Sequence, residues 1–148
     1  MKNVADYYNK TATGWSDEWL KEKKQSTILE KFYNCFHQGG TRTPKILDLG
    51  CGAGYDSKIL SKLGANVSGI DISEKLIQIA KDSVPECRFF VGDITKKFSE
   101  LGKFDGVLCL ATIVHVDITK MKSTLENIAD VLKKGGLLLL SSCDGVGK

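Results

Sequence analysis

The segment ILDLGCGAGYD, residues 46–56, joins an apolar run and a carboxylate to a glycine-rich turn. Glycines let the backbone approach a ligand closely, and the helix after such a turn presents unpaired N–H groups. The dinucleotide-binding fingerprint is G-x-G-x-x-G, but Tyr55 stands where its third glycine would be. Asp48 would also repel a pyrophosphate, since two like charges about 4 Å apart cost roughly 4 kcal/mol at an effective dielectric constant of 20. The turn therefore favours a ligand with a cationic end over a dinucleotide such as NAD.

Two more aspartates and a histidine follow later apolar runs. Asp71 ends NVSGID, Asp93 lies in VGDI, and His115 lies in LATIVHVD. A carboxylate offers two acceptor oxygens to ligand hydroxyl groups, and histidine is the usual acid–base residue. The alternatives are a helix or turn cap for each aspartate and a hydrogen-bonded structural role for the histidine.

These residues need a sheet to bring them together. Short apolar runs alternate with helical patterns along the chain, which predicts strands at residues 45–49, 66–70, 87–91, 104–110 and 137–142, and helices at 57–63, 74–82 and 118–133. Such alternation indicates parallel strands joined by right-handed crossovers, with helices on both faces. Ligands of such sheets sit beyond the carboxyl ends of the strands, where the strand order reverses.

The spacing of apolar residues also predicts helices near both ends of the chain. VADYYNKTATGW is weakly periodic, and Ser16 is placed to cap a helix from Asp17 toward His37, ended by Gly39 and Gly40. We expect a shared apolar face of Ile28, Leu29, Phe32 and Phe36 in this helix. In the last helix, which we expect Asp117 to cap, the apolar face would be Ile118, Met121, Leu125, Ile128 and Leu132.

The segments LDLGCGAG, GANVSGIDIS and FFVGDI together resemble the class I S-adenosylmethionine-dependent methyltransferases, over roughly residues 45–142. The resemblance implies an α/β fold, a three-layer Rossmann-like sandwich with a mainly parallel sheet. It implies S-adenosylmethionine as cofactor and S-adenosylhomocysteine as product. The cofactor carries a sulfonium and an ammonium group, which fits the acidity of the turn.

The resemblance also implies roles for particular residues. Asp48 would orient the turn and the methionine end of the cofactor, Asp71 would accept hydrogen bonds from the ribose hydroxyls, and Asp93 would accept one from the adenine amine. The full cofactor-binding set implied is Asp48, Gly50, Cys51, Gly52, Gly54, Asp71, Ile72, Asp93, Ile94 and Leu110.

The methyl acceptor is less well defined by the sequence. LATIVHVD lacks the N/D-P-P-Y/F pattern of enzymes that methylate amide or exocyclic amino nitrogens, and His115 is the candidate catalytic residue. An N-terminal helical segment closes over the site in many relatives, and here it offers four aromatic residues that either contact the acceptor or dock the segment on the sheet: Tyr7, Tyr8, Trp15 and Trp19. We expect residues 1–40 to form this lid and residues 41–148 the methyltransferase domain.

The family usually continues beyond the fifth strand with a helix and two more strands, so we expect a sheet that lacks its last two strands and a C-terminally truncated domain. The run LLLL, residues 137–140, reads as a strand buried on both faces. Without a neighbour it would be an exposed edge, so we expect the N-terminal segment, the tail or another chain to cover it.

Composition narrows the remaining possibilities. The chain has 148 residues, 42% hydrophobic and 26% charged, with a formal charge of +3. Acidic and basic residues are interleaved apart from KEKK at residues 21–24, which we interpret as a solvated helix face, so no nucleic-acid-binding surface is evident. There is no membrane-spanning run, signal peptide or metal-ligand spacing, and five cysteines outside any CxxC pair predict small buried thiols in a cytoplasmic protein.

The sequence thus predicts a methyltransferase acting on a small-molecule acceptor. Two alternatives remain open, a cofactor-binding module without turnover and an NAD-dependent oxidoreductase. The sequence identifies neither the acceptor nor the atom that is methylated.

Overall fold

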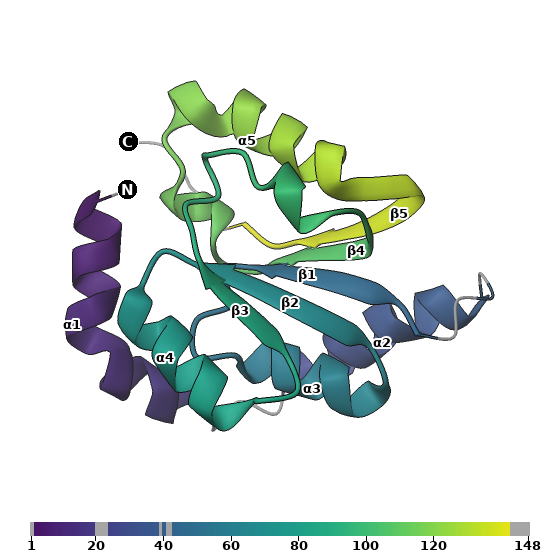
Figure 1. The fold of residues 1–148 in the computed structure, drawn as a ribbon, viewed down its shortest axis with the longest axis horizontal. Coiled ribbons are helices and arrows are strands. Elements are labelled where there is room, and N and C mark those ends of the chain that lie inside the picture. The colour runs from purple at the N-terminus through teal and green to yellow at the C-terminus, as the bar shows by residue number, and fades with distance from the viewer. Residues whose placement is uncertain (1, 20–23, 39, 41–42, 143–148) are drawn as a thin grey trace.

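The computed structural model describes residues 2–19, 24–38, 40 and 43–142, without the side chains of residues 2, 13–19, 24 and 25. Within these residues five parallel strands form one sheet in the order β3-β2-β1-β4-β5 (Figure 1). They are β1 (Lys45–Leu49), β2 (Asn66–Asp71), β3 (Arg88–Val91), β4 (Phe104–Cys109) and β5 (Leu132–Leu140). The first four lie within one residue of the predicted strands, whereas β5 begins at Leu132, before the predicted 137–142 and inside the helix predicted for 118–133. The strand order reverses between β1 and β4.

Helices cover both faces of the sheet (Figure 1). They are α1 (Lys2–Trp19), α2 (Lys24–Gln38), α3 (Tyr55–Leu63), α4 (Glu74–Ser83) and α5 (Ile118–Val131), with two short 3₁₀ turns, η1 (Ser99–Leu101) and η2 (Ile113–His115). Side chains of α2, α3 and α4 form one core cluster with the sheet, and α5 forms a second cluster on the opposite face. The predicted α/β three-layer Rossmann-like sandwich is therefore confirmed.

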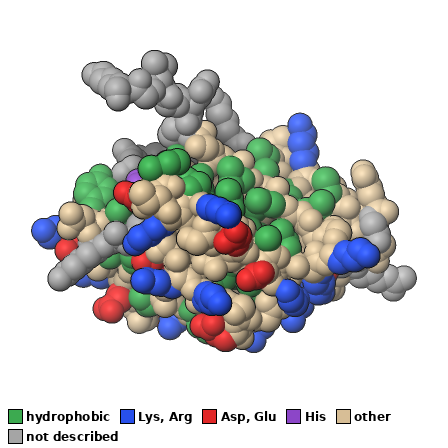
Figure 2. Space-filling model, turned by 90° about the horizontal axis from the view of Figure 1, so that it is seen from above, with side chains coloured by type: hydrophobic (Ala, Val, Ile, Leu, Met, Phe, Trp, Pro, Cys, Tyr) green, Lys and Arg blue, Asp and Glu red, His purple; other side chains and the backbone are tan. Residues whose placement is uncertain are grey.

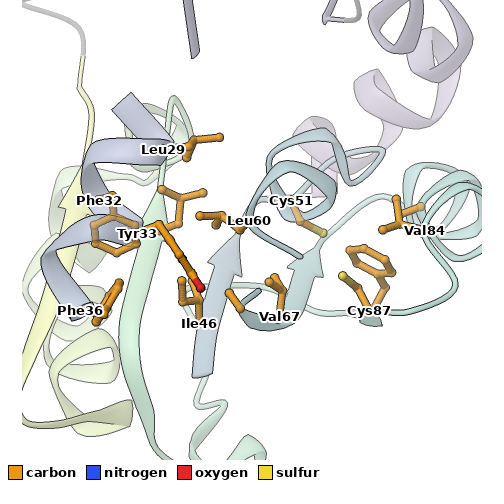
Figure 3. Packing of buried hydrophobic residues seen from close by; sticks show 14 of the residues in the cluster. Leu29, Phe32, Tyr33, Phe36, Ile46, Cys51, Leu60, Val67, Val84 and Cys87 are labelled. Carbon is orange, nitrogen blue, oxygen red and sulfur yellow. The ribbon is translucent and has the colours of Figure 1, made fainter. Parts of the chain in front are cut away.

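Helix α2 is part of the main core. Figure 3 shows Phe32 and Phe36 of α2 beside the sheet in the same cluster as Ile46 and Leu60. A Cβ atom at Gly106 of β4 would lie 2.5 Å from the ring of Phe36, so this position needs glycine for the helix to pack closely.

The predicted helix from Asp17 to His37 is wrong. Residues 17–19 belong to α1, and a separate helix begins at Lys24, so Ser16 lies inside α1 and is no N-cap. The weak periodicity of the first segment continues past Ser16, because no proline or pair of glycines ends the helix there. Most of KEKK lies outside the described residues. Leu29, Phe32 and Phe36 are buried as expected, whereas Ile28 is exposed.

The apolar face expected for the last helix is only partly buried. Helix α5 buries Thr124, Ile128 and Val131, while Ile118 is 81% exposed and Leu125 is also exposed. The helix ends at Val131 because Leu132 takes an extended conformation and begins β5. Figure 2 looks onto this side of the molecule and shows hydrophobic side chains among interspersed acidic and basic ones. The predicted N-cap is confirmed, since the Asp117 carboxylate accepts a 2.8 Å hydrogen bond from the Thr119 backbone N–H.

Strand β5 is not buried on both faces, contrary to expectation. Among the described residues it pairs only with β4, and it exposes Leu137, Leu138 (41%) and Leu140. Leu139 is partly buried against the core cluster that contains α2 residues, and the cover expected over this strand stays a prediction.

The expectation of buried thiols holds for three of the four described cysteines. Cys51, Cys87 and Cys109 are buried free thiols, whereas Cys35 is exposed on α2, and Cys143 lies outside the described residues. No helix in the described part of the chain is long and apolar enough to cross a membrane.

Candidate functional site

A cavity of about 130 Å³ opens at the carboxyl ends of β1, β2 and β4, where the strand order reverses. This is where the sequence predicts a ligand. Seven of the ten predicted cofactor residues line the cavity: Gly50, Cys51, Gly52, Asp71, Ile72, Ile94 and Leu110. Tyr8 and His115 line it as well.

The glycine turn is held by strand β2. The backbone N–H groups of Gly50 and Cys51 both donate to the carbonyl of Ile70, at 2.7 and 3.0 Å. The N–H of Gly52 donates to Asp71 Oδ2 at 3.0 Å. The turn is thereby fixed to the end of the neighbouring strand before any ligand binds.

Two of the glycines serve different purposes. Gly50 has φ = 74°, and a Cβ atom there would lie 2.0 Å from Thr112 Oγ1, so glycine lets the loop after β4 approach the turn. Gly52 has φ = 53°, and its Cβ atom would meet nothing within 4 Å. Since Gly52 lines the cavity, its missing side chain leaves space for a ligand.

Asp71 is a buried carboxylate that faces the cavity. It is 9% exposed, and its Oδ1 accepts a 2.8 Å hydrogen bond from the Ser73 N–H, opposite the bond from Gly52. Burial raises the pKa of Asp71, while these backbone hydrogen bonds and the nearby His115 act in the opposite direction. The predicted helix-cap alternative describes part of its role, because the carboxylate also orders the start of α4.

Asp48 lies beneath the turn and does not line the cavity. Its Oδ2 accepts a 2.6 Å hydrogen bond from the Ser57 hydroxyl of α3. Burial, with the nearby Asp56, raises the pKa of Asp48 to about 8. Burial thus favours the neutral form of this carboxyl group, which weakens the expected repulsion of a pyrophosphate by Asp48.

Gly54 and Asp93 also lie away from the cavity wall. Gly54 has φ = 85°, and a Cβ atom there would lie 3.0 Å from Phe89 and 3.1 Å from Ala80, so it permits close packing of α3. Asp93 Oδ1 accepts hydrogen bonds from the backbone N–H and hydroxyl of Thr95, at 2.9 and 2.7 Å. This geometry matches the turn-cap alternative, and the contact of Asp93 with the adenine amine stays a prediction.

One of the predicted N-terminal aromatic residues reaches the cavity. The Tyr8 hydroxyl lies 3.0 Å from His115 Nε2, and the two rings meet edge to face with centroids 5.7 Å apart. Tyr7 is 51% exposed and does not line the cavity. The side chains of Trp15 and Trp19 lie outside the described ones.

Helix α1 is attached to the site at a second point. The side-chain oxygen of Asn9 accepts hydrogen bonds from the Ser73 hydroxyl (2.6 Å) and the Lys75 N–H (3.3 Å) at the start of α4. Ser73 in turn donates its backbone N–H to Asp71. A continuous series of hydrogen bonds thus links α1 to the carboxylate in the cavity. Figure 1 shows α1 beside α4 and the carboxyl ends of the strands.

The sequence reasoning missed several residues of the site. Asp56 lines the cavity from the first turn of α3, and a carboxylate two residues after the glycine turn is the signal that could have identified it. Thr112 and Ala111 form the opposite wall. Ala111 has φ = 53°, a strained value for a residue with a side chain, and its N–H donates to Ser141 Oγ beyond β5 at 2.8 Å. Asn9 carried no sequence signal.

The arrangement can bind a ligand with a cationic end. The acidic side chains at the wall are Asp56 and Asp71, and Asp56 occupies the helix N-terminus at which a pyrophosphate would bind. No group of three or more histidine, cysteine, aspartate or glutamate side chains among the described residues is placed to hold a metal ion.

Known proteins with similar sequences and structures were compared with the chain. The chain is 35% identical over 102 residues to the ubiquinone biosynthesis O-methyltransferase of Coxiella burnetii. The matched region covers 66% of this chain and 42% of that protein. It therefore spans less than half the length of this relative. A TehB-like SAM-dependent methyltransferase from Corynebacterium glutamicum has the same fold, with a TM-score of 0.71, 28% identity, and coverage of 84% of this chain and 68% of that one.

A second solved structure supports the fold alone. The magnesium protoporphyrin IX methyltransferase of Synechocystis PCC 6803, solved with bound SAH, has a TM-score of 0.72 at 23% identity and covers 88% of this chain and 67% of that one. Residues 46–136 match the family model described as a methyltransferase domain. This match spans the glycine turn, the strand ends and η2, and the chain belongs to the methyltransferase domain family.

Proposed function

We propose that this domain binds S-adenosylmethionine in the cavity and transfers its methyl group to a small molecule. The observation that carries the proposal is the pairing of an open glycine turn with Asp71, whose carboxylate both faces the cavity and holds that turn. Family membership supports the same function.

The residues present fit this cofactor. Asp71 can accept hydrogen bonds from ribose hydroxyls while it keeps its backbone partners, because each carboxylate oxygen accepts more than one. Ile72 and Ile94 offer apolar surface for a base, and Asp56 offers negative charge for an ammonium group. The space at Gly52 is the cradle that a side chain would fill.

The cofactor, when bound, supplies an activated methyl group, and the chain holds the cofactor and the acceptor in position. A nucleophile must lie about 3 Å from the methyl carbon and in line with the bond that breaks. The loop after β4 faces the glycine turn across the cavity, and Val4 and Tyr8 of α1 form the wall on the side of the N-terminal helix. Residues 1–40 would then contribute a lid through α1, while α2 belongs to the core of the domain.

The first experiment is a calorimetric titration of the chain with S-adenosylhomocysteine, with NADH as the control ligand. Saturable binding of S-adenosylhomocysteine alone supports the proposal. Binding of NADH alone would instead favour the oxidoreductase. Cofactor binding without slow cofactor consumption across an acceptor panel would favour a binding module without turnover.

We also propose self-association through the β5 edge in a cytoplasmic protein. The exposed leucines of β5, whose second edge has no strand partner among the described residues, support the first point, and the buried free thiols support the second. Sedimentation velocity tests the association: Leu138→Lys should convert an assembled form to a monomer, and a wild-type chain that is monomeric at high concentration contradicts it.

A further inference from the structure

The contact between Tyr8 and His115 joins residues that are 107 positions apart. Both line the cavity, Tyr8 is half-buried, and His115 is exposed to solvent. The pair therefore has one side toward the ligand and the other toward water. A proton that enters the pair from the cavity can leave it to solvent.

Resting on the proposed function, we propose that Tyr8 and His115 are a proton-accepting pair and that the methyl acceptor is a molecule methylated on a hydroxyl oxygen. A hydroxyl is a poor nucleophile until its proton is removed, so a hydroxyl acceptor requires such a pair. A carboxylate or thiolate acceptor arrives already ionised. An ammonium acceptor would carry charge of the same sign as the sulfonium beside it.

The environment of the pair suits proton transfer to the imidazole. Burial, followed by the charge of Asp71 and the neighbouring Tyr7, raises the pKa of Tyr8, so its hydroxyl carries a proton that it can pass to His115 as it accepts one from the acceptor. Asp71 lines the same cavity as the pair, and the charge of His115 acts to lower the pKa of Asp71. The titratable groups lining the cavity around the pair are Cys51, Tyr55, Asp56 and Asp71.

The proposed step couples proton transfer through Tyr8 and His115 to methyl transfer. The acceptor hydroxyl gives its proton to Tyr8 Oη while the Tyr8 proton moves to His115 Nε2, so that tyrosine is neutral before and after. The acceptor oxygen forms a bond to the methyl carbon, the carbon–sulfur bond breaks, and its electron pair remains on sulfur. The imidazolium then loses its proton to water, and the products are a methyl ether, S-adenosylhomocysteine and a hydrated proton.

The test uses 4-nitrophenol, a hydroxyl probe whose visible absorption reports its ionisation. The wild-type chain, saturated with S-adenosylhomocysteine, should bind the probe and increase its ionised fraction. His115→Gln should abolish that increase and Tyr8→Phe should reduce it, while both retain S-adenosylhomocysteine binding by calorimetry. His37→Gln, which changes the other histidine, on α2, is the matched control and should behave as wild type.

A second readout separates proton transfer from a purely structural role. With S-adenosylmethionine, His115→Gln should slow methyl transfer to 4-nitrophenol by about 10²–10⁴-fold. Transfer to 4-nitrothiophenol, which is already a thiolate, should change little. Equal losses with both probes, unchanged probe ionisation in His115→Gln, or failure of the S-adenosylhomocysteine complex to bind the phenol would overturn the inference. Failure of the wild-type chain to bind S-adenosylhomocysteine would instead contradict the proposed function.

Discussion

Asp71 Oδ2 at the end of β2 accepts a 3.0 Å hydrogen bond from the backbone N–H of Gly52 in the turn after β1. This bond ties the glycine turn to the carboxylate that is proposed to hold the ribose. The same carboxylate orders the start of α4 through Ser73.

Asp71→Ala should weaken S-adenosylhomocysteine binding by about 1.5–3 kcal/mol, roughly ten- to a hundredfold, because it removes the ribose acceptor and leaves two backbone N–H groups without it. Calorimetric titration measures the change. Asp93→Ala is the comparison, since Asp93 also follows a strand but lies off the cavity wall, and it should have a smaller effect. Equal losses of affinity in the two variants would support the predicted contact between Asp93 and the adenine amine.

Gly52→Ala should impair ligand binding, whereas Gly50→Ala should mainly destabilise the fold. Gly52→Ala places a methyl group in open space, so the protein should fold, at a cost of roughly 1–2 kcal/mol from its positive φ, and bind S-adenosylhomocysteine poorly. Gly50→Ala meets Thr112 and should destabilise the fold more strongly. Urea unfolding and calorimetry on both variants check this contrast, and a Thr112→Gly change should partly rescue Gly50→Ala alone.

Asp48→Asn should flatten the dependence of stability on pH. The folded-state pKa of about 8 lies above the ordinary value of 3.8, so the folded chain holds a proton that the unfolded chain releases between these values. The free energy of unfolding should therefore fall as pH rises through this interval, by at most about 1.4 kcal/mol per pH unit.

The measurement for Asp48 is urea unfolding at pH 5.5, 6.5 and 7.5. An amide at position 48 can still accept the hydrogen bond from Ser57, so the variant should fold. The exposed carboxyl of Asp82 provides the control, and Asp82→Asn should keep the wild-type slope. Parallel slopes for wild type and Asp48→Asn would show that Asp48 is ionised in the folded state.

Asn9→Ala should loosen α1 from the start of α4. The change removes the acceptor for Ser73 and Lys75, at a cost of about 1 kcal/mol. Amide hydrogen exchange should accelerate in α1 with little change in β1. Gln78→Ala, which removes a surface contact with Asp82 on α4, is the control. Unchanged exchange in α1 would mean that its other contacts hold it in place.

The sequence by itself determined the strands and most of the cavity wall. Apolar runs bounded by glycine and aspartate define β1 and β2 locally, and parallel strands of an open sheet bring their carboxyl ends to one edge, so the sequence alone places Gly50, Gly52 and Asp71 together. The sequence pattern predicted burial less reliably, because packing against other elements decides it. Ile118 and Leu138 were expected to be buried and are exposed.

The tertiary structure decided what those side chains do. Tyr8 meets His115, and Asn9 meets Ser73, only because α1 packs beside α4, and no local pattern encodes contacts across 107 or 64 residues. Asp48 and Asp71 are both aspartates at strand ends in the sequence. One is buried beneath the turn, where its pKa is raised to about 8, while the other faces the cavity, because burial and hydrogen-bond partners, which depend on the whole fold, set the pKa of a carboxyl group.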